Sequence, residues 1–251
     1  MNGIKSHTHQ ERAIIIQKLI PLIRRKFKND LLAIATVGSF VLKADINYSD
    51  VELIVFTKEN SRLKEWVFHE IIDGMLIVVI TETKNGYIQK YLDIPEIWYA
   101  SGDSPLAPII NEKYINEINT FKPRTMEKRC WDQAAKRWYM YQEITAKVLN
   151  NIKKRNTTGL PIIFFSMIKE LLIILSFINQ TPYKTLEKYV EQAQMFSIKP
   201  DKFDNLLDIL NKGTYQDFTS LEESVTQVFT DLETIFQKHG YPLYKNSIDL
   251  V

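Results

Sequence analysis

Two short apolar runs on either side of a polar loop, within residues 31–57, most constrain how this chain can fold. The first run, residues 31–37, ends at Gly38-Ser39, and the second run, residues 51–57, follows the turn residues 47–49. Both runs are short, carry Ile and Val, and are bounded by turn residues. The pattern therefore predicts two strands.

Two carboxylates stand where the second strand begins. Asp50 and Glu52 are two residues apart, so in an extended chain their side chains project from the same face, while Val51 points to the other. Carboxylates held this close repel each other unless a cation lies between them or one takes a proton. Mg²⁺, which prefers oxygen ligands, suits the pair. The alternative is a strand-edge pair that is merely solvated.

The turn at Gly38-Ser39 predicts the complementary half of a site. If a helical turn begins there, its outward-facing amides and the helix dipole favour an anion. A phosphate held on one side and a metal-binding pair, Asp50 and Glu52, on the other is the arrangement that nucleotidyl transfer requires.

Composition narrows the class of protein. The chain has 251 residues, 45% of them hydrophobic, which allows one large or two modest domains. Lys and Arg number 32 against 30 Asp and Glu, with no long basic tract, so a nucleic-acid partner is not indicated. Cys130 is the only cysteine, which excludes an internal disulfide and a cysteine-cluster metal site.

The sequence also predicts a cytoplasmic protein with no membrane partner. The N-terminal stretch is polar and has no apolar signal core. The most apolar stretch, residues 160–179, is close to the roughly 20 residues of a membrane span. However, Lys169 and Glu170 interrupt it.

Along the chain, strand signals give way to helix signals near Pro123, which predicts an α+β protein with domains 1–122 and 123–251. In the first part, Asp73-Gly74 between apolar runs predicts a β-hairpin. Residues 98–106 are aromatic and then turn-rich, and are interpreted as a connection. The predicted helices are 6–29, with a kink at Pro21, then 83–92 and 111–119, and after Pro123 a bundle of 125–150, 162–179, 185–194, 201–211 and 220–238.

One pair in the second part has two interpretations. Glu143 and Lys147 are four apart, which places an acid and a base on one face of the predicted helix. Taken from spacing alone, they form an ordinary surface ion pair.

Several short motifs together resemble the kanamycin nucleotidyltransferase family, whose members adenylylate aminoglycosides. They are Gly-Ser followed by Asp-x-Glu, His-Glu at 69–70, Glu-x-x-x-Lys at 143–147, Leu-Pro at 160–161 and His-Gly-Tyr at 239–241. The resemblance implies an N-terminal nucleotidyltransferase fold, a mixed sheet with flanking helices, followed by a C-terminal helical bundle. It also implies a cleft between the halves that is shared across a homodimer.

The resemblance assigns roles residue by residue. It implies that Glu143 is the base for the acceptor hydroxyl, that Lys147 contacts the α-phosphate and that Glu70 contacts a cationic acceptor. The family's phosphate-contacting Gly-Arg pair is replaced by Val41-Leu42, followed by Lys43, a candidate substitute. Where the family has a further glutamate in the hairpin, this chain has Val79.

The predicted function is transfer of AMP from Mg-ATP to a hydroxyl of a small molecule, an aminoglycoside antibiotic first, with release of pyrophosphate. In this scheme Asp50 and Glu52 hold Mg²⁺, and Gly38, Ser39 and Lys43 contact the nucleotide. Two alternatives stay open. One is the same chemistry on a lincosamide or another hydroxyl acceptor, and the other is a catalytically impaired homologue that only binds nucleotide.

Overall fold

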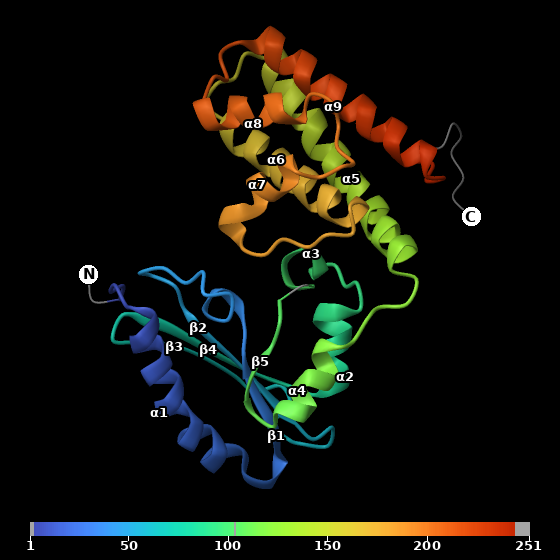
Figure 1. Ribbon diagram of the computed structural model, residues 1–251. Coiled ribbons are helices and arrows are strands. Elements are labelled where there is room, and N and C mark those ends of the chain that lie inside the picture. The colour runs from blue at the N-terminus through green and yellow to red at the C-terminus, as the bar shows by residue number, and fades with distance from the viewer. Residues whose placement is uncertain (1–2, 103, 244–251) are drawn as a thin grey trace. The chain divides into compact units, whose positions relative to one another are not determined.

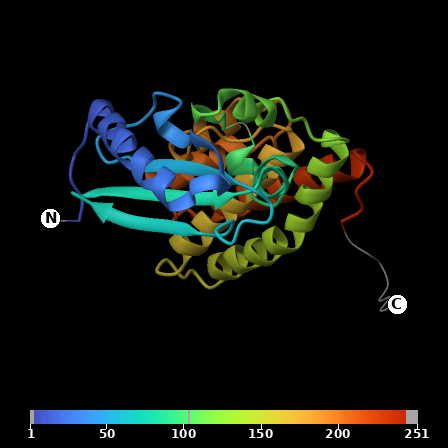
Figure 2. The same ribbon diagram turned by 90° about the horizontal axis from the view of Figure 1, so that it is seen from below.

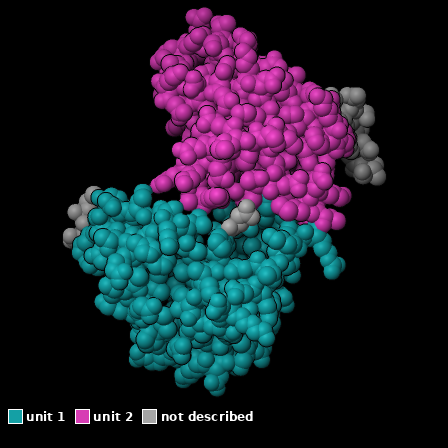
Figure 3. Space-filling model, in the orientation of Figure 1, with its two compact units in different colours: residues 1–124 teal, residues 125–251 magenta. Residues whose placement is uncertain are grey.

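The computed structural model describes residues 3–102 and 104–243. Its internal contacts divide the chain into two compact units, residues 1–124 and 125–251, coloured separately in Figure 3. The first unit contains the sheet and the second is helical, in keeping with the predicted α+β class. Each unit is described by itself.

The first unit is built on a five-stranded mixed sheet with the order β3-β4-β2-β1-β5. The pair β2–β4 is parallel, and the other three neighbouring pairs are antiparallel. The strands are β1 (Leu31–Thr36), β2 (Val51–Thr57), β3 (Val67–Ile72), β4 (Met75–Glu82) and β5 (Ala107–Ile110).

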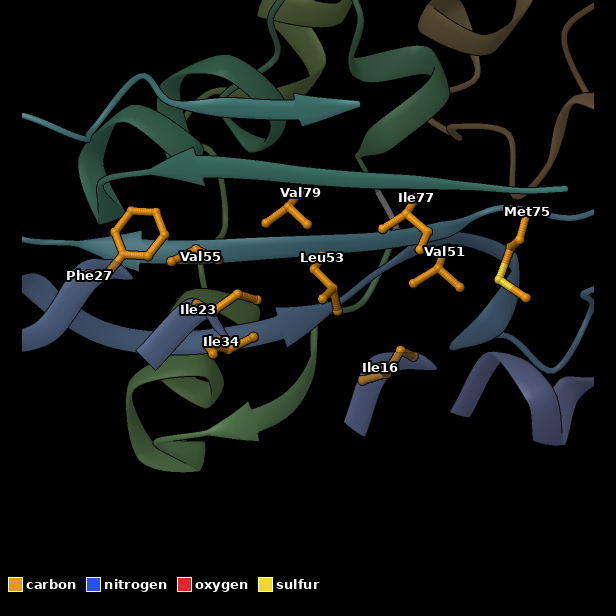
Figure 4. Close-up of a cluster of buried hydrophobic side chains, with 10 residues drawn as sticks. All are labelled: Ile16, Ile23, Phe27, Ile34, Val51, Leu53, Val55, Met75, Ile77 and Val79. Carbon is orange, nitrogen blue, oxygen red and sulfur yellow. The ribbon is translucent and has the colours of Figure 1, made fainter. Parts of the chain in front are cut away.

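Helix α1 (His9–Phe27) covers one face of this sheet, as both ribbon views show (Figures 1 and 2). It begins with a capping box in which Thr8 accepts from the amide of Glu11, and it continues through Pro21. Its apolar side packs against alternate residues of three strands. The buried cluster, drawn in Figure 4, comprises Ile16, Ile23, Phe27, Ile34, Val51, Leu53, Val55, Met75, Ile77 and Val79.

Short helices cover the opposite face. They are α2 (Lys84–Tyr87), the π-helix η3 (Ile88–Leu92) and α4 (Glu112–Asn119), while α3 (Trp98–Ser101) packs on η3. The cluster on this side contains Ala33, Ala35, Ile54, Phe56, Tyr87, Leu106, Ile115 and Ile118. Two 3₁₀ turns flank β1, namely η1 (Lys28–Asp30) and η2 (Gly38–Phe40). The strand β2 therefore has one face toward α1 and one toward the short helices.

The two edges of the sheet differ. The strand β5, which was not predicted, pairs with β1 and carries Pro108, which removes one backbone donor from this edge. At the other edge, β3 leaves Val67, Ile71 and Ile72 exposed. The predicted hairpin that joins β3 to β4 is confirmed.

The second unit is a bundle of helices, as predicted (Figure 1). The long helix α5 packs along α6, whose sequence is apolar almost throughout and mostly buried. By length and composition alone α6 could cross a membrane, but its burial is that of a core helix. The helices are α5 (Met126–Lys153), α6 (Leu160–Ile178), α7 (Tyr189–Gln194), α8 (Phe203–Lys212) and α9 (Phe218–Lys238), with a 3₁₀ turn η4 (Leu186–Lys188).

Candidate functional site

The candidate site in the sheet unit begins at the turn that follows β1. Gly38 has φ +75°, a left-handed conformation that favours glycine, and it opens the turn η2. A Cβ atom at Gly38 would lie 2.4 Å from Oε2 of Glu52. The glycine therefore allows the backbone after β1 to approach the carboxylate of β2 closely.

The backbone of Glu52 is held firmly in this position. Its carbonyl oxygen accepts hydrogen bonds from the Thr36 hydroxyl at 2.9 Å and from the Val37 amide at 3.3 Å. Both bonds come from the end of β1, so β1 and β2 together fix where the carboxylate emerges. This local order follows from the paired strands that the sequence predicts.

The charge of Asp50 acts on the carboxylate of Glu52. Glu52 is half-buried, and burial, followed by the nearby charge of Asp50, raises its pKa above the usual 4.5. Within residues 3–102 and 104–243, no Lys, Arg or His forms an ion pair with either carboxylate. The pair thus concentrates negative charge that this part of the protein leaves uncompensated.

A divalent cation fits this pair. Mg²⁺ is commonly bound by one or two carboxylates together with substrate phosphates, and not by a full protein cage. The described part of the chain contains no group of three or more His, Cys, Asp or Glu side chains arranged as a metal site. A bound cation would offset both the burial of Glu52 and its repulsion by Asp50.

Two of the predicted nucleotide contacts, Gly38 and Ser39, lie on the turn η2. The carbonyl of Ser39 accepts from the amide of Ala44 at 2.9 Å, which closes the turn, and its side chain is half-buried. Lys43 is exposed and has φ +50°. The structure therefore brings Gly38 and Ser39 to the carboxylate pair, while Lys43 stands on the loop that follows.

Strand register separates Glu70 from this pair. Residues paired across neighbouring strands point to the same face of a sheet. Glu52 pairs with Val78, which pairs with His69, whereas Glu70 pairs with Ile77 on the face covered by α1. The structure thus places His69, and not Glu70, on the face of Glu52.

The same register explains two other residues of the hairpin. Val79, which stands in place of a family glutamate, is buried in the cluster under α1. Glu82, at the end of β4, shares the face of Glu52 but lies four residues further along the strand, opposite Phe56. Its buried carboxylate pairs with Lys90 at 2.9 Å, so its charge is already compensated.

In the helical unit, Glu143 and Lys147 lie on α5 as predicted from their spacing. The Lys147 ammonium donates to Oε1 of Glu143 at 2.7 Å, and both side chains are substantially exposed, at 56% and 40%. A proton acceptor and a cation are therefore available on the surface of α5, already joined in an ion pair.

The sequence interpretation missed Arg12. This arginine of α1 is 1% exposed, and its guanidinium contacts the loop that joins η2 to β2. Its position four residues before Ile16, on the buried side of an amphipathic helix, could have predicted that Arg12 is buried.

The matches to known proteins extend over both units. Residues 135–242 match the model of the family described as the KNTase C-terminal domain. Two proteins described as aminoglycoside nucleotidyltransferase (4'), from Staphylococcus aureus and from a Bacillus species, are each 22% identical to this chain over 258 residues. In both cases 96% of this chain and 96% of the relative are covered.

A solved structure, of a nucleotidyltransferase-like protein from Exiguobacterium sibiricum, is 13% identical, with a TM-score of 0.49. It covers 89% of this chain and 75% of the other.

A mixed sheet with a Gly-Ser turn beside paired carboxylates, followed by a matching helical domain, defines this chain as an enzyme of the nucleotidyltransferase class. Within that class, its residues 135–242 match the KNTase C-terminal domain, and nearly its whole length is similar to the two aminoglycoside nucleotidyltransferases (4').

Proposed function

We propose that this enzyme transfers AMP from Mg-ATP to a hydroxyl group of a small molecule, with an aminoglycoside as the first candidate, and releases pyrophosphate. One observation carries the proposal. The half-buried carboxylate of Glu52 lies against Gly38, carries a raised pKa beside Asp50, and has no basic partner in the described residues. A half-buried carboxylate without a basic partner suits a site that binds a cation.

In this scheme, Asp50 and Glu52 hold the divalent cation, which when bound neutralises charge on the triphosphate. Ser39 and the backbone of the turn orient the phosphates. Lys43 stands on the next loop, where a lysine supplies a point charge in place of the bidentate fork of an arginine. Phosphoryl-type transfer depends mainly on such positioning and charge neutralisation.

We assign the acid–base role to the helical unit. Glu143 accepts the proton of the attacking hydroxyl, and Lys147 contacts the α-phosphate. Their existing ion pair supports this division, because a lysine drawn toward phosphate leaves the carboxylate free to accept a proton. We also propose that the enzyme acts in the cytoplasm and forms a homodimer. Light scattering on the purified protein tests the homodimer.

The acceptor is proposed from the relatives, both of which are described as aminoglycoside nucleotidyltransferases. The charge of the hairpin favours a second candidate, a less cationic hydroxyl acceptor such as a lincosamide. Of its carboxylates, Glu82 is paired with Lys90 and Asp73 with Lys5, which leaves Glu70. Polycations are best bound by several uncompensated carboxylates.

The test is pyrophosphate release from ATP and Mg²⁺ with a panel of aminoglycosides and lincosamides. Asp50→Asn should lower turnover by about 10²-fold or more, because metal-assisted charge stabilisation contributes several kcal/mol. The control is Glu59→Gln, an exposed carboxylate just beyond the other end of β2. Equal turnover by Asp50→Asn and wild type would contradict the proposal that Asp50 holds the divalent cation. Mg²⁺-dependent ATP binding without pyrophosphate release would indicate the catalytically impaired alternative.

A further inference from the structure

A buried arginine holds the loop that separates the two halves of the candidate site. The guanidinium of Arg12 donates three hydrogen bonds to this loop, residues 41–49. Nε donates to the carbonyl of Ser49 at 3.0 Å, Nη2 to the carbonyl of Ile46 at 2.5 Å, and Nη1 to Oδ2 of Asp45 at 3.0 Å. Ser49 directly precedes Asp50, so this network, here called the Arg12 clamp, reaches the end of the loop that carries the metal-binding carboxylate.

The clamp also reaches the other end of the loop. Asp45, whose side chain is 2% exposed, bonds through Oδ1 to Nδ1 of His9 at 2.8 Å. The ring of His9 stacks on Phe40 with centroids 4.3 Å apart and planes 7° from parallel. Phe40 directly follows Ser39 in the turn η2. Through Arg12, Asp45 and His9, helix α1 therefore contacts residues adjacent to both Ser39 and Asp50.

Packing alone does not account for this arrangement. Removing an arginine and an aspartate from water is costly, and an apolar residue at position 12 would continue the buried stripe of Ile16 and Ile23. A guanidinium, however, presents several donors in a rigid planar fork, which fits one carboxylate and two carbonyls at once. The clamp thus fixes the path of a loop in which the side chains of Ile46 and Tyr48 are exposed.

We propose that Arg12 is a positioning residue for nucleotidyl transfer, which fixes residues 45–49 and so holds the Asp50 carboxylate beside Glu52 and the Ser39 turn. This inference rests on the proposed function. Asp50 and Glu52 repel each other, so the backbone before Asp50 must be restrained for the two to stay together until a cation binds. Partners that orient metal ligands in this way commonly change metal affinity by about 10–100-fold when removed.

The experiment compares four variants of the full chain with wild type. Arg12→Lys keeps the positive charge but loses the planar guanidinium that donates to three acceptors at once. The double variant Arg12→Met/Asp45→Asn removes the clamp without leaving an unpaired buried charge. Arg25→Met, an exposed arginine on the same helix, and Ile16→Val, which weakens the core under α1 without altering the clamp, are the controls.

Two readouts are measured on folded protein, verified by thermal melting. The first is Mn²⁺ affinity by electron paramagnetic resonance, with Mn²⁺ as the probe of the carboxylate pair. The second is amide hydrogen exchange of residues 44–51. We expect the double variant to bind Mn²⁺ about tenfold more weakly and to exchange faster in this segment. Arg12→Lys should fall between it and wild type, and both controls should match wild type.

Wild-type Mn²⁺ affinity and exchange in the double variant would overturn the inference, as would equal losses in Ile16→Val. If the loop exchanges faster but Mn²⁺ affinity is unchanged, Arg12 is only a structural residue and the positioning role is also overturned. Failure of the wild-type protein to bind Mn²⁺ would count against the proposed function. The exchange measurement would then still decide whether Arg12 fixes the loop.

Discussion

Protonation of the Glu52 carboxylate should change the stability of the folded protein. Its pKa in the folded protein lies above the usual 4.5, mainly because of burial. The folded protein therefore binds this proton more tightly than the unfolded chain does, and stability is lost as pH rises from about 4.5 through the raised pKa. Once the pH is above the raised pKa, the whole penalty is present.

Glu52→Gln should remove that penalty. Without metal, we expect the variant to melt a few degrees above wild type at neutral pH and to lose this advantage below about pH 4, where both forms are neutral. Mg²⁺ should raise the melting temperature of wild type and not of the variant. Differential scanning calorimetry across pH checks this, and a variant that melts lower than wild type at neutral pH would contradict it.

Glu143 separates a catalytic from a purely structural interpretation. As a surface ion pair with Lys147, it would contribute only about 0.2–0.5 kcal/mol to α5. As the base, its loss in Glu143→Gln should lower kcat by about 10²–10⁴-fold with the melting temperature nearly unchanged. Steady-state kinetics with the best acceptor measure this.

A matched control comes from α8. Asp208 pairs with Lys212 four residues later, at 2.8 Å and with both side chains 65% exposed. Asp208→Asn removes the same kind of pair, so it should change neither kcat nor stability appreciably. If Glu143→Gln behaves like Asp208→Asn, then Glu143 is an ordinary surface residue.

At the scale of elements, strand register governs which hairpin residue can serve the site. The sequence motif favours Glu70 as an acceptor contact, but the pairing of β3 with β4 places it on the face covered by α1. We therefore expect Glu70→Gln to change the acceptor KM by less than about threefold, a loss well under 1 kcal/mol. A rise of tenfold or more, measured with an aminoglycoside, would restore the sequence prediction.

The elements also show what the sequence could and could not predict. The strands β1 and β2 and the hairpin turn were predictable, because Gly38 and Asp73-Gly74 mark chain reversals that ordinary residues adopt poorly. The strand β5 was not, since four residues that include Pro108 become a strand only by pairing with β1. The spacing of Asp50 and Glu52 was visible, but the partnership of Arg12 with Asp45, 33 residues away, was not.

At the scale of the whole molecule, the division into two units predicts where a protease will cut. Arg124 and Thr125 lie at the boundary, are exposed, and are not part of a helix or strand. Lys122 precedes proline, a bond that trypsin cleaves poorly. Limited digestion should therefore first yield fragments 1–124 and 125–251.

Mass spectrometry of the early digest identifies these fragments. A first cut within β1–β5 or within α5 would contradict the division, because it would mean that a unit opens more readily than the connection. Replacement of Arg124 by Gln is the control, since it should slow this cut and leave later ones unchanged.

The contrast between the sheet's two borders has a practical consequence. Proline at β5 discourages a further strand from joining there, whereas β3 is an edge strand that carries exposed apolar side chains. At high concentration the protein should therefore aggregate through the edge strand β3. Ile71→Lys should reduce this aggregation, because a charge on an edge strand opposes pairing with a second molecule.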